Sequence, residues 1–214
     1  MAIIMSDSYK TVKEFSSGEF VEKRSRFIGW AKPVKTEAEA LDFINKIKKE
    51  HWDARHNCYA YTLREGSVKR YSDDGEPQGT AGVPMLDVLT KNEIEDVVVV
   101  VTRYFGGVLL GTGGLVRAYS KAAKIALDAA KVITMSVCSE CTLSCNYNQY
   151  GKLNTLILND GAVIDGTDFS DNVTLKFHIP SDRLNSLEKN IADATAGTVK
   201  VEIVDEKYFE IDEI

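Results

Sequence analysis

The stretch that decides the fold reads Val97-Val98-Val99-Val100-Val101-Thr102-Arg103-Tyr104-Phe105-Gly106-Gly107-Val108-Leu109-Leu110-Gly111-Thr112-Gly113-Gly114. The five valines lie in an apolar segment, 94–104, which predicts a strand buried on both faces of a sheet. The glycines that follow permit positive φ angles and a close approach of the backbone. A helical pattern then begins, which predicts a helix to about Lys131. A glycine-rich joint therefore connects a buried strand to a helix.

The expected helix has an apolar face and a basic face. The apolar stripe faces the core and consists of Leu115, Ala118, Tyr119, Ala122, Ile125, Ala126 and Ala129. The cations fall on another side, at Arg117, Lys121, Lys124 and Lys131. The amides and the dipole of a helix start favour an anion. This face, with Arg103 at the strand end, is therefore a candidate phosphate-binding surface. From the helix alone, a solvated basic face is an equal alternative.

The joint matches neither common nucleotide motif. Gly111-Thr112 stands where a Walker A motif has Gly-Lys-Ser/Thr, and the last glycine of a dinucleotide fingerprint is missing. Close packing of the helix on the sheet is the alternative explanation for the glycines. The candidate residues for nucleic-acid or phosphate binding, with Tyr104 to stack or pack, are Arg103, Tyr104, Gly106, Gly107, Gly111, Thr112, Gly113, Gly114, Arg117, Lys121 and Lys124.

The rest of the first half alternates strands and helices. Two extended segments, 9–15 and 19–34, predict a hairpin or meander about Ser16-Ser17-Gly18. A capping box at Thr36 and Glu39 predicts a helix to about Glu50. The remaining expectations are a strand at 55–63, a long loop at 64–83 and a short helix at 84–89. Residues 1–135 thus form an α+β or α/β domain, after an irregular start over residues 1–8.

The second half predicts a domain of its own over residues 136–214. Strand patterns occur at 136–146, 162–166, 173–179 and 198–211, and helical patterns at 147–158 and 180–197. The order βαββαβ is that of a ferredoxin-like split βαβ module. The chain is therefore expected to be an α+β protein of two domains.

Charge is divided unequally between these halves. The 214 residues carry a net charge of -6, but residues 1–135 hold 20 Lys and Arg against 18 Asp and Glu, a net of +2. The remainder holds 6 against 14, a net of -8. A polyanion should prefer the first domain, because Lys and Arg neutralise its phosphates. The acidic second domain is a possible surface for a protein partner.

The sequence argues against a membrane-spanning protein and against an exported one. The longest apolar run is far shorter than the ~20 residues that span a bilayer, and no secretory signal opens the chain. Four cysteines in 214 residues do not indicate a disulfide framework. We therefore expect a cytoplasmic protein without membrane contact.

A second candidate site combines a strand with an acidic loop. His56 and Cys58 are two apart on the expected strand, while Asp73, Asp74 and Glu76 give three carboxylates in four residues. Such groups can form a thiolate and its base, or hold Mg²⁺ beside a phosphate. Core residues and a solvated turn are the commoner explanations. We predict that His56, Asp74 and Glu76 form an additional pocket at most and are not a catalytic centre.

A zinc site is also disfavoured. The spacing of Cys138, Cys141 and Cys145 is not that of paired zinc knuckles, and Cys141 and Cys145 share one strand face. Buried thiols explain them better. No metal and no cofactor is therefore expected.

Several of these strings resemble the YigZ/IMPACT family. They are Asp74-Gly75-Glu76-Pro77, Gly79-Thr80-Ala81-Gly82 and the stretch 97–111, together with His56-Asn57-Cys58 and the segment 113–119. The resemblance covers nearly the whole chain. It implies a first domain with the fold of ribosomal protein S5 domain 2, and a ferredoxin-like second domain similar to a terminal domain of elongation factor G.

The resemblance implies a role in translation. Eukaryotic members regulate translation by restraining an amino-acid-starvation kinase, and RNA or ribosome binding is inferred for bacterial members from their folds. We therefore expect an RNA- or ribosome-binding protein that regulates translation. The alternatives are an enzyme acting on a small phosphorylated ligand and a protein-interaction adaptor. Binding is favoured over catalysis because the sequence shows no complete nucleophile-base or metal set.

Overall fold

A computed structural model of the chain describes residues 8–211, which divide into two compact units. The first unit comprises residues 9–134 and the second residues 135–211 with Ser8. The irregular start that we expect over residues 1–8 lies almost entirely outside the described residues. Helices and strands alternate in both units, which confirms the two-domain α+β fold. Among the described residues, no helix is both long and apolar enough to cross a membrane.

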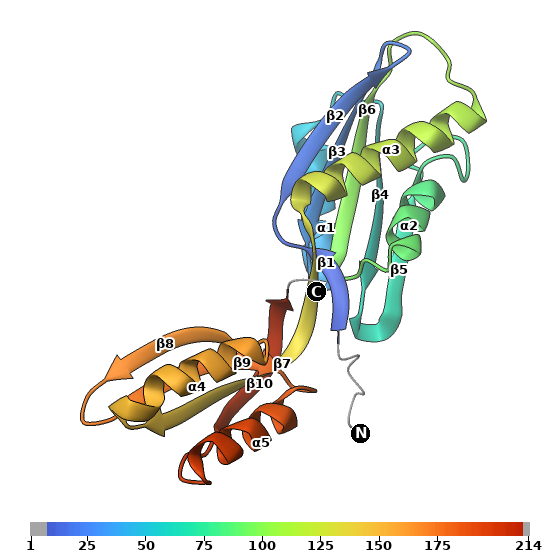
Figure 1. Ribbon diagram of the computed structural model, residues 1–214. Coiled ribbons are helices and arrows are strands. Elements are labelled where there is room, and N and C mark those ends of the chain that lie inside the picture. Colours follow the sequence, from blue (N-terminus) through green and yellow to red (C-terminus); the bar gives the residue numbers. More distant parts are fainter. Residues whose placement is uncertain (1–7, 212–214) are drawn as a thin grey trace. The chain divides into compact units, whose positions relative to one another are not determined.

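The first unit is built on an antiparallel five-stranded sheet of order β2-β3-β6-β4-β5 (Figure 1). β6 is the central strand, and the short strand β1 lies outside this sheet. The bounds of these elements are β1 (Ser8–Val12), β2 (Ser16–Glu22), β3 (Ser25–Pro33), α1 (Glu37–Glu50), β4 (His56–Leu63), the 3₁₀ turn η1 (Glu65–Ser67), β5 (Val68–Ser72), α2 (Gly82–Lys91), β6 (Val97–Tyr104) and α3 (Thr112–Ala130).

The valines of β6 supply two cores, one on each face of the sheet. Val97, Val99 and Val101 pack with residues of α2 and α3, whereas Val98 and Val100 pack with residues of α1. In Figure 1, α3 crosses in front of the sheet and α1 lies behind it. Successive side chains of a strand point to opposite faces, so an all-valine strand satisfies both cores. This confirms the prediction of a strand buried on both faces.

Helix α3 lies unusually close to the sheet. A Cβ atom on Gly29 of β3 would come within 2.3 Å of the backbone oxygen of Ala122. The prediction of α3 itself is confirmed, as is the capping box that begins α1, where Thr36 and Glu39 bond each other's backbone amides.

Two local predictions in the first unit are wrong. The hairpin turn lies at Lys23 and Arg24, which have φ angles of 44° and 65°, and not at residues 16–18. Residues 16–18 belong to β2 because they pair with β3. The predicted loop 64–83 also contains β5, an exposed edge strand without the alternating pattern that would identify it.

The second unit has the predicted element order. Its elements are β7 (Val132–Cys145), α4 (Tyr147–Asn159), β8 (Val163–Phe169), β9 (Val173–Pro180), α5 (Leu184–Thr195) and β10 (Glu202–Ile211). The strand order β10-β7-β9-β8 gives the split βαβ topology of a ferredoxin-like module. Cys138 and Cys141 are buried free thiols, and burial raises the pKa of each to about 11.

Candidate functional site

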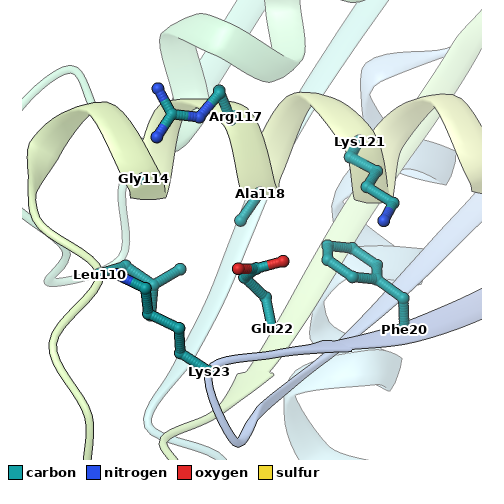
Figure 2. A pocket seen from close by; sticks show the side chains of 8 residues that line it. All are labelled: Phe20, Glu22, Lys23, Leu110, Gly114, Arg117, Ala118 and Lys121. Carbon is teal, nitrogen blue, oxygen red and sulfur yellow. The ribbon is translucent and has the colours of Figure 1, made fainter.

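A hollow of about 260 Å³ opens in the first unit between the end of β2 and the start of α3. Figure 2 shows the side chains that surround it. Three cations, one carboxylate and several apolar groups contribute. We call it the basic pocket, and its lining consists of Phe20, Glu22, Lys23, Leu110, Gly114, Arg117, Ala118 and Lys121.

The strand side of the basic pocket is set by the β2–β3 hairpin. Phe20 lies opposite Phe27 of β3, and the two rings stack with their centroids 5.3 Å apart. The turn at Lys23 and Arg24 has two residues with positive φ, the geometry that suits the twist of a tight hairpin. This turn places the Lys23 side chain at the rim of the basic pocket (Figure 2).

The helix side comes from the first turns of α3. Arg117 and Lys121 are four residues apart and so share one helix face, while Ala118 turns toward the sheet. The helix begins after Gly111 without a side-chain cap. No atom of residues 8–211 accepts a hydrogen bond from the first three amides of α3, those of Thr112 to Gly114. The helix start therefore retains free donors beside the cations.

The three cations of the basic pocket share its lining with one carboxylate, that of Glu22. Within the described part of the chain, no carboxylate forms an ion pair with Lys23, Arg117 or Lys121. The Nζ atom of Lys121 instead lies 4.3 Å from the ring centroid of Phe20. The half-buried Lys48, by contrast, is bonded to Asp74 at 2.7 Å. The basic pocket thus presents unpaired positive charge to solvent.

The glycines predicted to bind phosphate differ in their roles. A Cβ on Gly106 would lie 2.0 Å from the backbone oxygen of Arg24, so Gly106 is required for packing against the hairpin turn. Gly107 and Gly111 have φ angles of 82° and 74° and open space around them, so they shape the chain that leads to α3. Gly114 lines the basic pocket, while Lys124 is exposed further along the helix.

The expectation that Arg103 and Tyr104 lie at the phosphate-binding surface is not met. The Arg103 side chain is 6% exposed and pairs with Glu76 at 2.5 Å. Neither residue lines the basic pocket. The hydroxyl of Tyr104 donates to Asp53 at 3.1 Å and contacts Nδ1 of His51 at 2.9 Å. The reason is that β6 is buried as far as Arg103, so the strand directs this side chain into the protein.

Arg103 belongs to a second group of residues, the buried polar cluster of His56, Glu76, Arg103 and Tyr119. Oε1 of Glu76 accepts a hydrogen bond from Nη1 of Arg103 and one from the Tyr119 hydroxyl at 2.7 Å. Nε2 of His56 lies 3.8 Å from the same oxygen, and Nδ1 lies 2.8 Å from the carbonyl oxygen of Asp74. The acidic loop therefore closes on β4 and β6, an arrangement that its sequence did not indicate.

The acidic loop uses its other carboxylates to hold its own backbone. Asp73 accepts hydrogen bonds from the amides of Gly79, Ala81 and Gly82, so it anchors the start of α2. Asp74 accepts from the amide of Asn57 and from Lys48. Within residues 8–211, no three His, Cys, Asp or Glu side chains are grouped closely enough to hold a metal ion.

The side chains of the buried polar cluster are bonded mainly to one another and to the acidic loop. Its carboxylate already has two strong donors, and Glu76 is 3% exposed. Burial raises the pKa of the neighbouring Cys58 thiol, whose Sγ donates to the carbonyl of Asp73, so the thiol stays protonated. One donor of the cluster, Nε of Arg103, is buried without a hydrogen-bond partner among the described residues.

Five residues of the basic pocket are missing from the sequence-based candidates. They are Phe20, Glu22, Lys23, Leu110 and Ala118, of which Ala118 was expected only in the apolar stripe of the helix. Phe20 and Glu22 lie at the end of β2 and Lys23 in the turn that follows, whereas the expected turn lay at residues 16–18. The charged run 22–24 between two apolar segments was the signal for the true turn.

Comparison with known proteins identifies both domains. The Impact N-terminal domain matches residues 23–127, and a domain of unknown function, DUF1949, matches residues 143–198. IMPACT family member YvyE of Bacillus subtilis is 39% identical over 207 residues, which cover 96% of this chain and 95% of YvyE. IMPACT family member YigZ of Escherichia coli is 35% identical over 188 residues, which cover 86% of this chain and 92% of YigZ.

A solved structure described as the crystal structure of an hypothetical protein is 31% identical to the chain. It matches with a TM-score of 0.59 over 95% of this chain and 100% of that chain. The matches thus extend over both domains in sequence and in structure. The chain belongs to the IMPACT family and combines the Impact N-terminal domain with DUF1949.

Proposed function

We propose that the protein binds RNA, free or as part of a ribosome, through the basic pocket of its first domain. The observation that carries this proposal is the set of three unpaired cations, Lys23, Arg117 and Lys121, around one hollow at an uncapped helix start. Lys and Arg side chains and helix N-terminal amides are the groups that contact nucleic-acid phosphates. Lys124 extends the same basic face along α3.

The charge distribution supports a polyanion as the partner. The first domain carries a net +2 and the second a net -8, so phosphates are attracted to the domain that holds the basic pocket. The translation role that the resemblance implies for eukaryotic members supports RNA in particular. Regulation of translation is the process in which we place this binding.

A second candidate function, an enzyme acting on a small phosphorylated ligand, rests on the convergence of His56 and Glu76 beside Arg103. Burial and internal hydrogen bonding of Glu76 disfavour it. A screen of phosphorylated metabolites with the whole chain tests it, since turnover that His56→Ala abolishes would favour the enzyme over the binding protein.

The proposal is tested by ribosome co-sedimentation and by RNA titration with the full chain at two salt concentrations. We expect binding at low salt that weakens as salt rises, because the released counterions drive phosphate binding. Replacing Arg117 and Lys121 by Gln should weaken it at both concentrations. Absence of binding at low salt, or unchanged binding by this double variant, would contradict the proposal.

A further inference from the structure

We propose that the basic pocket receives one unpaired nucleotide of an RNA strand, with the base on Phe20 and the phosphates on the surrounding cations. This inference rests on the proposed function and deepens it, because it names single-stranded RNA as the preferred ligand. It depends on the size of the pocket, on the aromatic ring in it and on the place of Glu22.

The size of the basic pocket suits a single base. Its volume of about 260 Å³ lies just below the range of ~300 to 1,000 Å³ that is typical of sites for larger small molecules. Phe20, Leu110 and Ala118 give it an apolar interior, and the cations lie around the rim (Figure 2). A base held in a duplex is stacked and paired, so it cannot enter such a hollow, whereas an unpaired base can.

The aromatic ring in the basic pocket packs against a second ring of the sheet. Phe20 stacks on Phe27, with an angle of 11° between the rings. Phe27 in turn meets Tyr119 edge to face, at a centroid distance of 5.4 Å. A preorganised ring beside unpaired cations is the combination with which proteins bind single strands, because every base has a π face.

Lys121 now occupies the space that the base would take. Its ammonium group lies over the Phe20 ring at 4.3 Å, and Figure 2 shows the side chain reaching toward this ring. A cation–π contact at an exposed site is weak, so an incoming base can replace it. The displaced ammonium group remains on a flexible stem within reach of the strand's phosphates.

Glu22 argues against a phosphate group as the occupant of the hollow itself. A carboxylate is a hydrogen-bond acceptor and carries the same charge sign as phosphate, so it repels a phosphate that enters the hollow. It can accept hydrogen bonds from a ribose hydroxyl or from the amino group of a base. The lining thus separates a place for the nucleoside, near Phe20 and Glu22, from a cationic rim for phosphate.

The test compares three RNA ligands of equal length that differ in whether they offer an unpaired base to the pocket. A labelled RNA of about 10 nucleotides, within the range of known single-strand site sizes, is titrated with the full chain at low salt as a single strand, as a duplex and as an abasic strand. We expect the single strand to bind at least about fivefold more tightly than either of the others, the low end of the effect of one stacked base.

Two variants test whether the preference for single strands comes from the basic pocket. Phe20→Leu keeps an apolar contact with Phe27 but removes the π face, and should weaken single-strand binding about fivefold while duplex binding stays unchanged. Phe15→Leu is the matched control, because Phe15 is an aromatic residue that is 51% exposed and lies outside the basic pocket. Should Phe20→Leu not fold, the abasic strand tests the same contact with the wild-type protein.

The outcomes separate this inference from the proposed function. Equal affinity for all three ligands, with loss on Arg117→Gln, would overturn the inference and leave RNA binding intact. No binding of any ligand at low salt would overturn both. Competition by a free nucleoside monophosphate at the affinity of the strand would also overturn the inference, because the pocket would then be a metabolite site.

Discussion

Replacing Glu76 by Gln should destabilise the first domain strongly, although the two side chains have nearly the same shape. The carboxylate of Glu76 is the counter-ion of Arg103 inside the buried polar cluster, and the two side chains are 3% and 6% exposed. In Glu76→Gln, the amide oxygen can still accept hydrogen bonds from Arg103 and Tyr119. What disappears is the negative charge, so the guanidinium group remains buried without a counter-ion.

The size of the effect follows from the burial of the pair. Breaking a buried ion pair by removing one partner costs ~3 to 5 kcal/mol. Because the two hydrogen bonds can persist in Glu76→Gln, we expect the lower end, about 3 kcal/mol. Apart from cation–π contacts with Phe27 and Phe105, both at 5.4 Å, little compensates the charge of Arg103. Its remaining described side-chain hydrogen bond, from Nη2 to Ser25, is long at 3.4 Å, and its Nε has no hydrogen-bond partner within the described chain.

The assay is urea unfolding followed by tryptophan fluorescence. The chain has two tryptophans, Trp30 and Trp52, and both lie in the first unit, so the signal reports on this domain in the full chain. Trp30 on β3 donates a hydrogen bond to Thr102 of β6, which couples its environment to the sheet. The shift of the unfolding midpoint, multiplied by the slope m, gives the loss of stability.

The chain offers a control pair of the same residue types and closest distance that is exposed instead of buried. Glu19 pairs with Arg26 at the same distance of 2.5 Å, but these side chains are 54% and 52% exposed. Glu19→Gln should therefore change stability by less than about 1 kcal/mol. Adding Arg103→Met to Glu76→Gln should recover most of the loss, because the unpaired charge is then removed. Equal losses for both Gln variants, or no recovery in the double variant, would refute the reasoning.

Three further predictions concern packing, capping and thiol reactivity. Gly29→Ala should cost about 1 to 3 kcal/mol by overpacking, because its Cβ would lie 2.3 Å from the Ala122 oxygen and force α3 away; an unchanged urea midpoint would contradict this. Thr36→Ala should cost about 1 kcal/mol, measured in the same way, because it removes the cap of α1. The Cys58 thiol should resist a thiol reagent in the folded protein at pH 8, because burial raises its pKa, and should react once urea unfolds the chain; rapid labelling of the native protein would be the contrary result.

The parts of the fold that were predictable from sequence are those with strong local patterns. The valines of β6 and the apolar stripe of α3 identified the core elements, because both patterns are long and regular. The capping box of α1 identified the start of that helix, because its two hydrogen bonds are local in the sequence. The edge strand β5 was missed because exposed strands carry no apolar alternation.

The two sites were harder because they depend on contacts between distant segments. The Arg103–Glu76 pair joins residues 27 positions apart, and no local pattern indicates that the acidic loop folds back on the sheet. The basic pocket joins the β2 hairpin to α3, so Arg117 and Lys121 could be predicted from the helix pattern but Phe20 and Lys23 could not. The true hairpin turn had to be known before that surface could be assembled.

The salt dependence of RNA binding tests the central claim most directly. The full chain is titrated with RNA over a range of salt concentrations, alongside a double variant with Arg117→Gln and Lys121→Gln. Loss of two phosphate contacts should make the slope of log K against log[salt] shallower by about 1.4 on a single strand. The control replaces Lys46 and Lys91 by Gln, since these exposed helical lysines already pair with Glu50 and Asp87.

We predict that the control variant keeps the wild-type slope and affinity. The variant of the basic pocket should bind RNA more weakly and show the shallower slope. The same net charge is removed in the two variants, so a difference between them must come from position. If both variants change RNA binding equally, or if neither does, the basic pocket is not the RNA-binding site and the account is contradicted.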